Sequence, residues 1–247
     1  MPRPGNRAPM AIPANPAPST ATSTCRASGV GDFVVIPLVN HTTEHRRRLQ
    51  PHVAYDDGMS ELSGRLVLVV GATGGLGSRL ASQLEAAGAT VVRAARHGGP
   101  EQLPVDLRSA DSINTLVSSL DSLDGVVVAA GVVAFGPSDA VADATLQELF
   151  EVNALGPIRL IRGLTPLLAQ SATAGRSPFI VTISGIVSES PTAGLAAYSA
   201  SKSAIAAFIT AVTRELRRVG VRVLDARPGH TETALSTHPI AGTAPTF

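Results

Sequence analysis

The sequence contains little cysteine, lysine or aromatic residue. Of its 247 residues, one is cysteine, two are tyrosine and none is tryptophan. The single cysteine, Cys25, excludes an internal disulfide and a cysteine cluster for zinc, so we expect a cytoplasmic location and no metal site. The net charge of +1 at pH 7 gives no support for binding to nucleic acid through bulk electrostatics.

The amino-terminal part also lacks a hydrophobic run long enough to span a membrane. The apolar run at residues 33–39 is short and contains Pro37. Even so, 44% of all residues are hydrophobic, and a chain of this length can bury a full core. We therefore expect one substantial domain and no membrane partner.

The first 58 residues differ from the rest in composition. They are rich in Pro, Ala, Ser and Thr, and show no sustained period apart from a short strand at residues 33–36. Such a composition indicates a disordered or loosely attached extension. We expect the catalytic domain to occupy residues 59–247, with Met59 as its natural start.

From Arg65 onward, strand and helix patterns alternate. We predict strands at residues 65–70, 90–94, 102–105, 125–130, 179–184 and 221–226, and helices at residues 76–87, 109–120, 144–169 and 197–219. Apolar runs without alternation are typical of strands buried on both faces, and helical crossovers require parallel pairing. The predicted fold class is α/β, a doubly wound, Rossmann-like parallel sheet in three α/β/α layers.

The only lysine, Lys202, lies four residues after Tyr198, in a chain with nineteen arginines. Positions i and i+4 share one face of a helix, so the ammonium can lie beside the phenol. A neighbouring cation lowers a phenol pKa from its reference value of about 10 toward a range useful for proton transfer. Taken alone, the pair also fits a solvated helix face, and a GC-rich genome would explain the scarcity of lysine.

A glycine-rich turn joins the first predicted strand to the first helix. Gly71, Gly75 and Gly77 allow a tight turn and let backbone N–H groups approach a pyrophosphate at the positive end of the helix. Placed between a strong strand and a helix, the turn predicts dinucleotide binding.

In order and spacing, these motifs resemble the short-chain dehydrogenase/reductase family, in its compact reductase branch, over residues 62–235. The further matches are Asp106 and Leu107 (the pair that holds adenine), Ala130 and Gly131 (the end of NNAG), Asn153 (the helix asparagine), Tyr198 and Lys202 (YxxxK), and Pro228, Gly229 and Thr233 (PGxxxT). The extended branch of sugar epimerases needs a long carboxyl-terminal domain, which this sequence does not contain.

The resemblance implies a mechanism and a set of site residues. Tyr198 would donate a proton to a carbonyl oxygen as hydride arrives from the nicotinamide, or remove it in reverse. Lys202 would lower the tyrosine pKa and hold the nicotinamide ribose, and Asn153 would anchor a water that relays protons. The implied cofactor-binding residues are Gly71, Thr73, Gly75, Leu76, Gly77, Arg96, Asp106, Leu107, Ala130, Gly131, Tyr198, Lys202, Pro228, Gly229 and Thr231.

The end of the second strand bears on the choice of cofactor. An acidic residue there would bond the ribose of NAD, whereas an arginine suits the 2′-phosphate of NADP. The segment has no acid, and Arg96 falls where the family often has its phosphate-binding arginine, with Arg93 nearby. We expect NADPH rather than NAD; the alternative is a solvated arginine in a turn. His230 is interpreted as a loop residue near the pocket rather than a base.

The chain departs from the family pattern at three places. The family's catalytic serine position, thirteen residues before Tyr198, is Gly185. Its neighbour Ser184 would replace the hydroxyl only if the strand has already ended or bulges there, and Ser188 and Ser190 are weaker substitutes. We therefore group Ser184 with Asn153, Tyr198 and Lys202 as catalytic candidates.

The other two departures concern the pocket. The two asparagines of NNAG are Val128 and Ala129, and the sequence stops fourteen residues after Thr233. The family usually continues with a substrate-covering helix and a seventh strand. The pocket is therefore open, completed by a partner, or covered by residues 234–247.

The sequence thus predicts an NADPH-dependent oxidoreductase acting on a small carbonyl or alcohol substrate, as a homodimer or homotetramer. One alternative is a nucleotide-binding relative that has lost catalysis and acts as a sensor or scaffold. Another is a 3-oxoacyl-carrier reductase of fatty-acid or polyketide type, whose acidic carrier would meet Arg217 and Arg218. Without a substrate loop to interpret, the substrate itself is not predicted.

Overall fold

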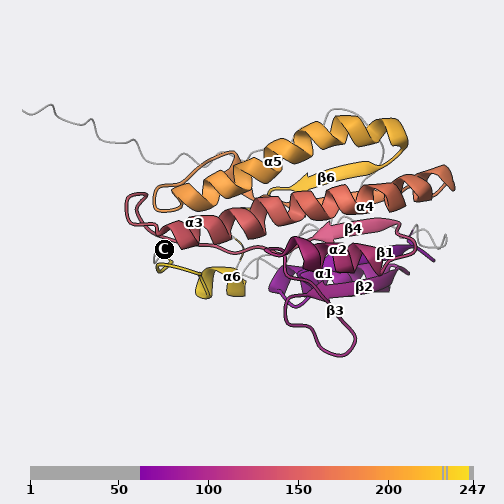
Figure 1. Ribbon diagram of the computed structural model, residues 1–247, viewed down its shortest axis with the longest axis horizontal. Coiled ribbons are helices and arrows are strands. Elements are labelled where there is room, and N and C mark those ends of the chain that lie inside the picture. Colours follow the sequence, from indigo (N-terminus) through magenta and orange to yellow (C-terminus); the bar gives the residue numbers. More distant parts are fainter. Residues whose placement is uncertain (1–61, 230, 232, 245–247) are drawn as a thin grey trace, which may run out of the picture. The chain divides into compact units, whose positions relative to one another are not determined.

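The computed structural model describes residues 62–229, 231 and 233–244. The predicted extension at residues 1–58, its strand at residues 33–36 and His230 lie outside the described residues. Within them, six strands form one parallel sheet in the order β3-β2-β1-β4-β5-β6 (Figure 1). From β1 the chain adds β2 and β3 on one side and then β4, β5 and β6 on the other. This is the doubly wound arrangement that the alternation of strands and helices predicts, and it confirms the expected fold class.

Six strands and six α-helices make up this part of the chain. The strands are β1 (Leu66–Val70), β2 (Thr90–Ala95), β3 (Leu103–Pro104), β4 (Gly125–Val128), β5 (Phe179–Ile183) and β6 (Arg222–Ala226). The helices are α1 (Gly75–Ala86), α2 (Ala110–Ser118), α3 (Asp143–Phe150), α4 (Gly156–Thr173), α5 (Ala196–Leu216) and α6 (Ala234–Thr237). Three short turns are the π-helix η1 (Glu151–Leu155) and the 3-10 helices η2 (Ile186–Ser188) and η3 (Arg217–Val219).

The long helix predicted at residues 144–169 is present and runs without a break from Asp143 to Thr173. It consists of α3, the π turn η1 and α4, and the π turn was not predicted. Pro157 at the start of α4 has no N–H for the helical ladder. Gly156 lies close to the backbone of the segment after β3, and a Cβ at Gly156 would come 2.5 Å from the carbonyl oxygen of Leu107. A widened turn therefore precedes this tight contact.

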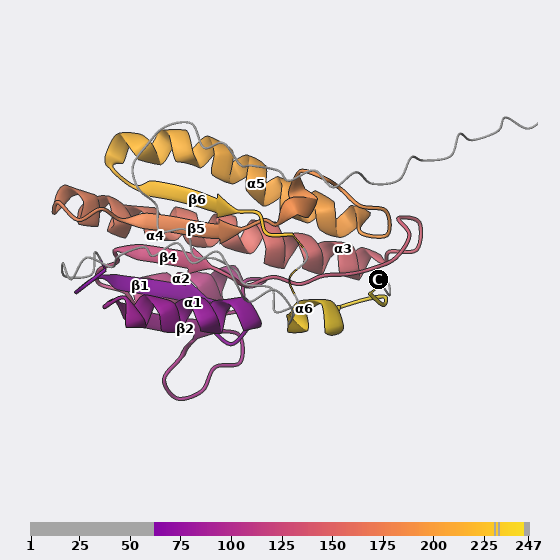
Figure 2. The ribbon, with the colours of Figure 1, turned by 180° about the vertical axis from the view of Figure 1, so that it is seen from behind.

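Helices cover the two faces of the sheet unequally. The larger core cluster joins alternate strand residues such as Leu68 and Val126 to helices α2, α4 and α5. Leu164 of α4 is fully buried in this cluster. The smaller cluster joins Val67 and Val69 to α1. In Figure 2, α1 lies over β1 and β2, whereas no described helix lies in front of β5 and β6. Burial of each large core side chain contributes about 1.5–3 kcal/mol.

The segment after β6 returns to the middle of the sheet. Beyond α6, Ala241 forms a parallel bridge with Ala134, and its carbonyl oxygen accepts a 2.9 Å hydrogen bond from the Phe135 N–H. A Cβ at Gly242 would lie 1.9 Å from the Phe135 oxygen, so only glycine allows this approach. The tail therefore lies beside the chain that follows β4, and the three arrangements considered for the pocket stay predictions. Among the described helices, none is long and apolar enough to cross a membrane.

Asp124, just before β4, fastens the amino-terminal edge of the sheet. Its carboxylate accepts hydrogen bonds from Ser171 Oγ (2.6 Å), the Leu66 N–H (2.8 Å) and Arg176 Nε (2.5 Å). Burial raises the pKa of Asp124, but these hydrogen bonds and the Arg176 charge outweigh it and lower the pKa to about 2. The ionised carboxylate therefore stabilises the fold.

We expect this contribution to disappear in acid. Because the folded pKa lies below the unfolded value of 3.8, the stabilisation is present above about pH 4 and is lost as pH falls toward 2. Asp124→Asn should cost about 1–2 kcal/mol at neutral pH, with the gap to the unmodified protein closing over that window. Denaturant unfolding from pH 7 to 2 measures this, with the exposed Asp121→Asn as control. Parallel curves at all pH values would contradict the prediction.

Candidate active site

The glycine-rich turn is built for close backbone approach. Gly71 has φ +84°, and a Cβ there would lie 2.6 Å from the Ala130 nitrogen. A Cβ at Gly77 would lie 2.1 Å from the Gly71 oxygen. The turn is thereby pressed against the chain that follows β4, and α1 begins without a side-chain cap. Uncapped N–H groups at a helix start suit a phosphate, so the turn fits the predicted dinucleotide.

Residues after β6 approach the same turn. A Cβ at Gly75 would lie 3.4 Å from the side chain of Thr233. The Ile186 N–H donates a 2.9 Å hydrogen bond to the Pro228 oxygen, and the Thr231 hydroxyl donates to the Gly229 oxygen at 3.2 Å. The predicted PGxxxT segment therefore lies between the end of β5 and the glycine-rich turn.

Asp106, after β3, already has a partner. Arg108 holds its carboxylate through Nη2 (2.7 Å) and Nε (3.0 Å), and the hydrogen bond from Arg108 lowers the Asp106 pKa although burial opposes it. Leu107 beside it is buried. An adenine amino group would have to share the carboxylate with Arg108, a contact that the sequence motif did not indicate.

The two arginines at the end of β2 are in different states. Arg93 forms an ion pair with Glu85, with Nη2 2.8 Å from Oε2. Arg96 is exposed and forms no ion pair within the described part of the chain, although its charge adds to the lowering of the Asp106 pKa. Arg96 is therefore the one of the two that is available to a 2′-phosphate.

Lys202 and Asn153 meet beside Gly131. A Cβ at Gly131 would lie 3.2 Å from Asn153 Oδ1 and 3.3 Å from Lys202 Nζ. Asn153, in the π turn η1, is 2% exposed; its Oδ1 accepts from the Val132 N–H at 2.9 Å and its Nδ2 donates to the Val132 oxygen at 2.8 Å. Asn153 thus anchors the chain after β4 at the point where Gly131 leaves room.

Lys202 is 6% exposed, and its ammonium donates a 2.9 Å hydrogen bond to the Ile183 oxygen. The Nζ atom lies 5.9 Å from the centre of the Tyr198 ring, which is carried three residues into α5. The predicted i, i+4 pair therefore shares one face of the helix. A cavity of about 10 Å³ lined by Asn153, Thr182, Ile183 and Lys202 adjoins them, about the size that holds one water molecule.

The expected lowering of the tyrosine pKa is not found in this structure. Burial raises the pKa of Tyr198 to about 12. Burial also lowers the pKa of Lys202 to about 8, opposed by the charge of Asp225. The reason is geometric, because the Lys202 ammonium is directed at the Ile183 carbonyl oxygen rather than at the Tyr198 phenol.

Ser184 follows the last residue of β5, so the condition for a changed orientation is met. Its hydroxyl, however, is fully buried and donates to Asp225 Oδ2 at 2.7 Å. Gly185 has φ +76°, a conformation that L side chains rarely adopt. The Ser188 hydroxyl bonds back to the Gly185 oxygen at 2.8 Å, and Ser190 is exposed. The Ser184 hydroxyl could donate a hydrogen bond to a substrate carbonyl only by breaking its bond to Asp225.

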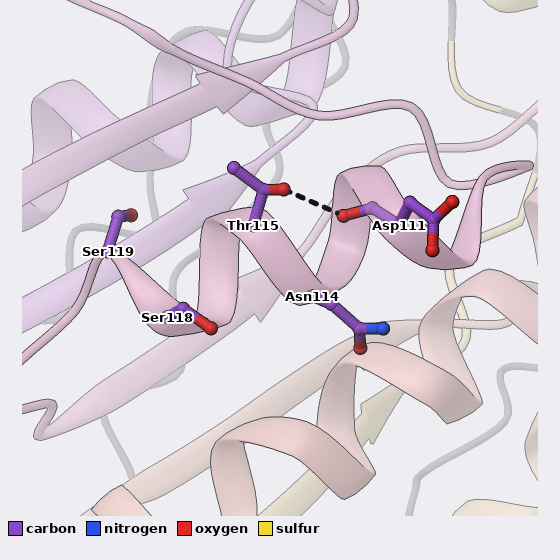
Figure 3. A pocket seen from close by; sticks show the side chains of 5 residues that line it. All are labelled: Asp111, Asn114, Thr115, Ser118 and Ser119. Atoms are coloured by element: carbon purple, nitrogen blue, oxygen red, sulfur yellow. Dashed lines mark hydrogen bonds between the residues drawn. The ribbon is translucent and has the colours of Figure 1, made fainter.

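A separate hollow lies on the exposed face of α2. It has a volume of about 510 Å³ and is lined by Asp111, Asn114, Thr115, Ser118 and Ser119 (Figure 3). The Thr115 hydroxyl donates a 2.9 Å hydrogen bond to the backbone carbonyl oxygen of Asp111 in the same helix. None of the predicted site residues lines this hollow, so it does not enter the chemistry considered below.

Residues 65–241 match the family model described as short chain dehydrogenase. The chain belongs to the short-chain dehydrogenase/reductase family. This is a family of oxidoreductases that act on CH–OH and C=O groups. The resemblance inferred from the motifs is therefore confirmed.

Individual relatives agree with this assignment. The chain is 30% identical over 182 residues to the 2,3-dihydro-2,3-dihydroxybenzoate dehydrogenase of Escherichia coli, covering 70% of this chain and 72% of that protein. It is 30% identical over 210 residues to the dehydrogenase/reductase SDR family protein 7-like of Anopheles gambiae, covering 75% of this chain but only 65% of that relative. A short-chain dehydrogenase from Shigella flexneri complexed with NADP has a TM-score of 0.65 and 26% identity, covering 71% of this chain and 81% of that one.

Two contacts near the site escaped the motif analysis. Asp225 and Arg227, on and just after β6, are bonded to each other at 2.8 Å and to Ser184 and Glu189 respectively. The sequence does contain one indication of these contacts, the acidic residue Asp225 in the mostly apolar strand β6, because a buried carboxylate needs hydrogen-bond partners. The family motifs do not include this position.

The buried position of Ser184 leads to a prediction about the serine. We expect Ser184→Ala to lower stability by about 1–2 kcal/mol, because Asp225 loses a donor, while kcat/KM falls less than ten-fold. Gly185→Ser should also destabilise, by about 1–2 kcal/mol, because of its positive φ. Thermal unfolding and steady-state kinetics of both variants measure this. A loss of ten-fold or more in Ser184→Ala at unchanged Tm would instead show that the hydroxyl contacts the substrate.

Proposed function

We propose that the protein is an NADPH-dependent oxidoreductase that reduces a small carbonyl compound, or oxidises the corresponding alcohol. The observation that carries the proposal is the convergence of Asn153 Oδ1 and Lys202 Nζ beside Gly131, with Tyr198 on the same helix face as Lys202. The site lies at the carboxyl edge of a parallel sheet, where ligands of this fold class bind.

The residues around the glycine-rich turn and the ends of the strands fit a dinucleotide. Gly71, Gly75 and Gly77, with Thr73 and Leu76, would hold the pyrophosphate, and Asp106 and Leu107 the adenine. Ala130 and Gly131, with Pro228, Gly229 and Thr231, would line the nicotinamide end. When bound, the nicotinamide supplies or accepts the hydride. The free guanidinium of Arg96 would pair with a 2′-phosphate, as the absence of an acid at the end of β2 also favours.

Tyr198 acts as the proton donor in this scheme. As hydride reaches the carbonyl carbon, the phenol proton passes to the carbonyl oxygen and an alcohol results. Burial raises the pKa of Tyr198 to about 12, so the phenol carries the proton that reduction requires at neutral pH. Lys202 holds positive charge beside the tyrosinate that forms, and the cavity between Asn153 and Lys202 offers a path for reprotonation.

A second candidate is a nucleotide-binding relative without catalysis. It is favoured by the Ser184 hydroxyl, which is committed to Asp225, and by Gly185 at the family's serine position. The buried Lys202 and Asn153 argue against it, because burying an ammonium without a use for its charge is costly. Such a protein would bind NADPH with no turnover of any carbonyl substrate.

The carrier-reductase alternative has less support in the arrangement of charge. Arg217 and Arg218 lie in η3, after the carboxyl end of α5, whereas Tyr198 lies in the first turn of that helix. At 1.5 Å per residue, the helix separates Tyr198 from the two arginines by about 29 Å. The cytoplasmic location, the homodimer or homotetramer and the division of the chain at residues 58 and 59 stay predictions.

Tyr198→Phe tests the function. We expect turnover of an active carbonyl substrate to fall by roughly 100-fold or more, because the ring still packs but the proton is lost. NADPH binding should stay within a few fold. NADPH fluorescence with a panel of ketones, aldehydes and acyl thioesters gives both values. Activity retained in Tyr198→Phe would rule out its assigned role, and no activity in the unmodified protein would favour the sensor.

Arg96→Asp tests the cofactor. The variant loses a charge-assisted contact and adds repulsion to the 2′-phosphate, so NADPH affinity should fall by roughly ten-fold to a hundred-fold while NADH affinity changes little. The matched control is Arg93→Gln, because Arg93 is already paired with Glu85. Equal weakening of both cofactors would show that Arg96 does not contact the phosphate.

A further inference from the structure

A buried carboxylate on β6 has no role in the chemistry described so far. The Asp225 side chain is 7% exposed. Its Oδ1 accepts from Thr182 Oγ1 at 3.0 Å and from the Ser184 N–H at 3.3 Å, and its Oδ2 accepts from Ser184 Oγ at 2.7 Å and Arg227 Nε at 2.8 Å. Two of its neighbours, Thr182 and Ser184, therefore flank a single residue of β5.

That residue is Ile183, whose carbonyl oxygen receives the Lys202 ammonium at 2.9 Å. The carboxylate of Asp225 grips the chain immediately before and immediately after this carbonyl. Thr182 is paired with Asp225 in the parallel ladder, and Ile183 with Ala226. Because side chains alternate along strands, Asp225 and the buried Thr182 project from the same face of the sheet.

The charges around Lys202 come from several elements. The charge of Asp225 on β6 opposes the lowering of the Lys202 pKa by burial. Behind Asp225 lie Arg227 and, beyond it, Glu189, which form an ion pair. On α5 itself, the titratable neighbour is Tyr198, at 5.9 Å. Asn153, the polar group from η1, carries no charge.

We propose that Asp225 is a positioning residue of this site. Its carboxylate fixes the end of β5 on both sides of Ile183, directs that carbonyl at the Lys202 ammonium, and supplies a negative charge near this buried cation. Its importance for turnover rests on the proposed function, but its effect on Lys202 does not. The hydrogen bonds of Asp225 go to Thr182, Ser184 and Arg227, so its role in turnover would be exerted through Lys202.

The chain offers a direct measurement, since Lys202 is its only lysine. Lysine carrying a carbon isotope label at Cε gives one side-chain NMR signal, whose titration in the full-length protein reports the Lys202 pKa without substrate or cofactor. In Asp225→Asn, which keeps the shape but loses the charge, we expect this pKa to fall by about one unit or more. An unchanged value would overturn the proposal.

Asp124→Asn is the matched control. Asp124 is also buried and also accepts from a serine hydroxyl, a backbone N–H and an arginine, but it lies before β4, at the opposite edge of the sheet. The variant should lower Tm and leave the Lys202 titration unchanged. An equal shift in both variants would mean a general effect of destabilisation and would also refute the proposal.

A second variant covers the case in which Asp225→Asn does not fold. Arg227→Gln removes the half-exposed cation that competes for Asp225, so the Lys202 pKa should rise rather than fall. A fall, or no change, would contradict the proposed balance of charges.

Kinetics separate this proposal from the proposed function. In Asp225→Asn the high-pH limb of the kcat profile for carbonyl reduction should move to lower pH, and in Ser184→Ala, which keeps the charge, it should not. A shifted NMR titration without any turnover in the unmodified protein would support the role of Asp225 and reject the oxidoreductase.

Discussion

A buried ammonium is the constraint on which the arrangement of this site depends. Lys202 is 6% exposed, and an isolated charge in such a place is too costly to persist. The Ile183 carbonyl and the Asp225 carboxylate offset that cost. Both belong to the carboxyl ends of strands, Ile183 to β5 and Asp225 to β6.

On the side of Lys202 that faces the segment after β4, backbone atoms are closely packed. Asn153 is held by both backbone groups of Val132, and the absent side chain of Gly131 leaves the space into which Asn153 and Lys202 converge. Gly71 in turn lies against Ala130. The glycine-rich turn and the catalytic candidates are therefore neighbours along one stretch of backbone after β4, and a shift in this stretch would disturb both.

Sequence patterns predicted the six strands, the order of motifs and the family, because apolar runs and glycine turns report local structure and its burial. They did not predict the π turn at Asn153, because helical periodicity does not distinguish a widened turn that arises from a tertiary contact at Gly156. The partners of Asp106 and Ser184 were missed for a related reason. Arg108 and Asp225 bind them through side-chain geometry, which a motif does not encode. The rise in the Tyr198 pKa depends on burial, a property of the folded chain alone.

The two buried aspartates show how position in a parallel sheet separates stability from chemistry. Asp124 and Asp225 have nearly the same set of partners, each with a serine, a backbone N–H and an arginine. Parallel strands place all their carboxyl ends at one edge, and ligands of this fold bind there. Asp124 lies at the other edge, where its charge meets only structural partners. Asp225 lies where β5 ends near Lys202, so its network also holds the carbonyl that receives the Lys202 ammonium. The direction of the chain, rather than the chemistry of the carboxylate, assigns the two roles.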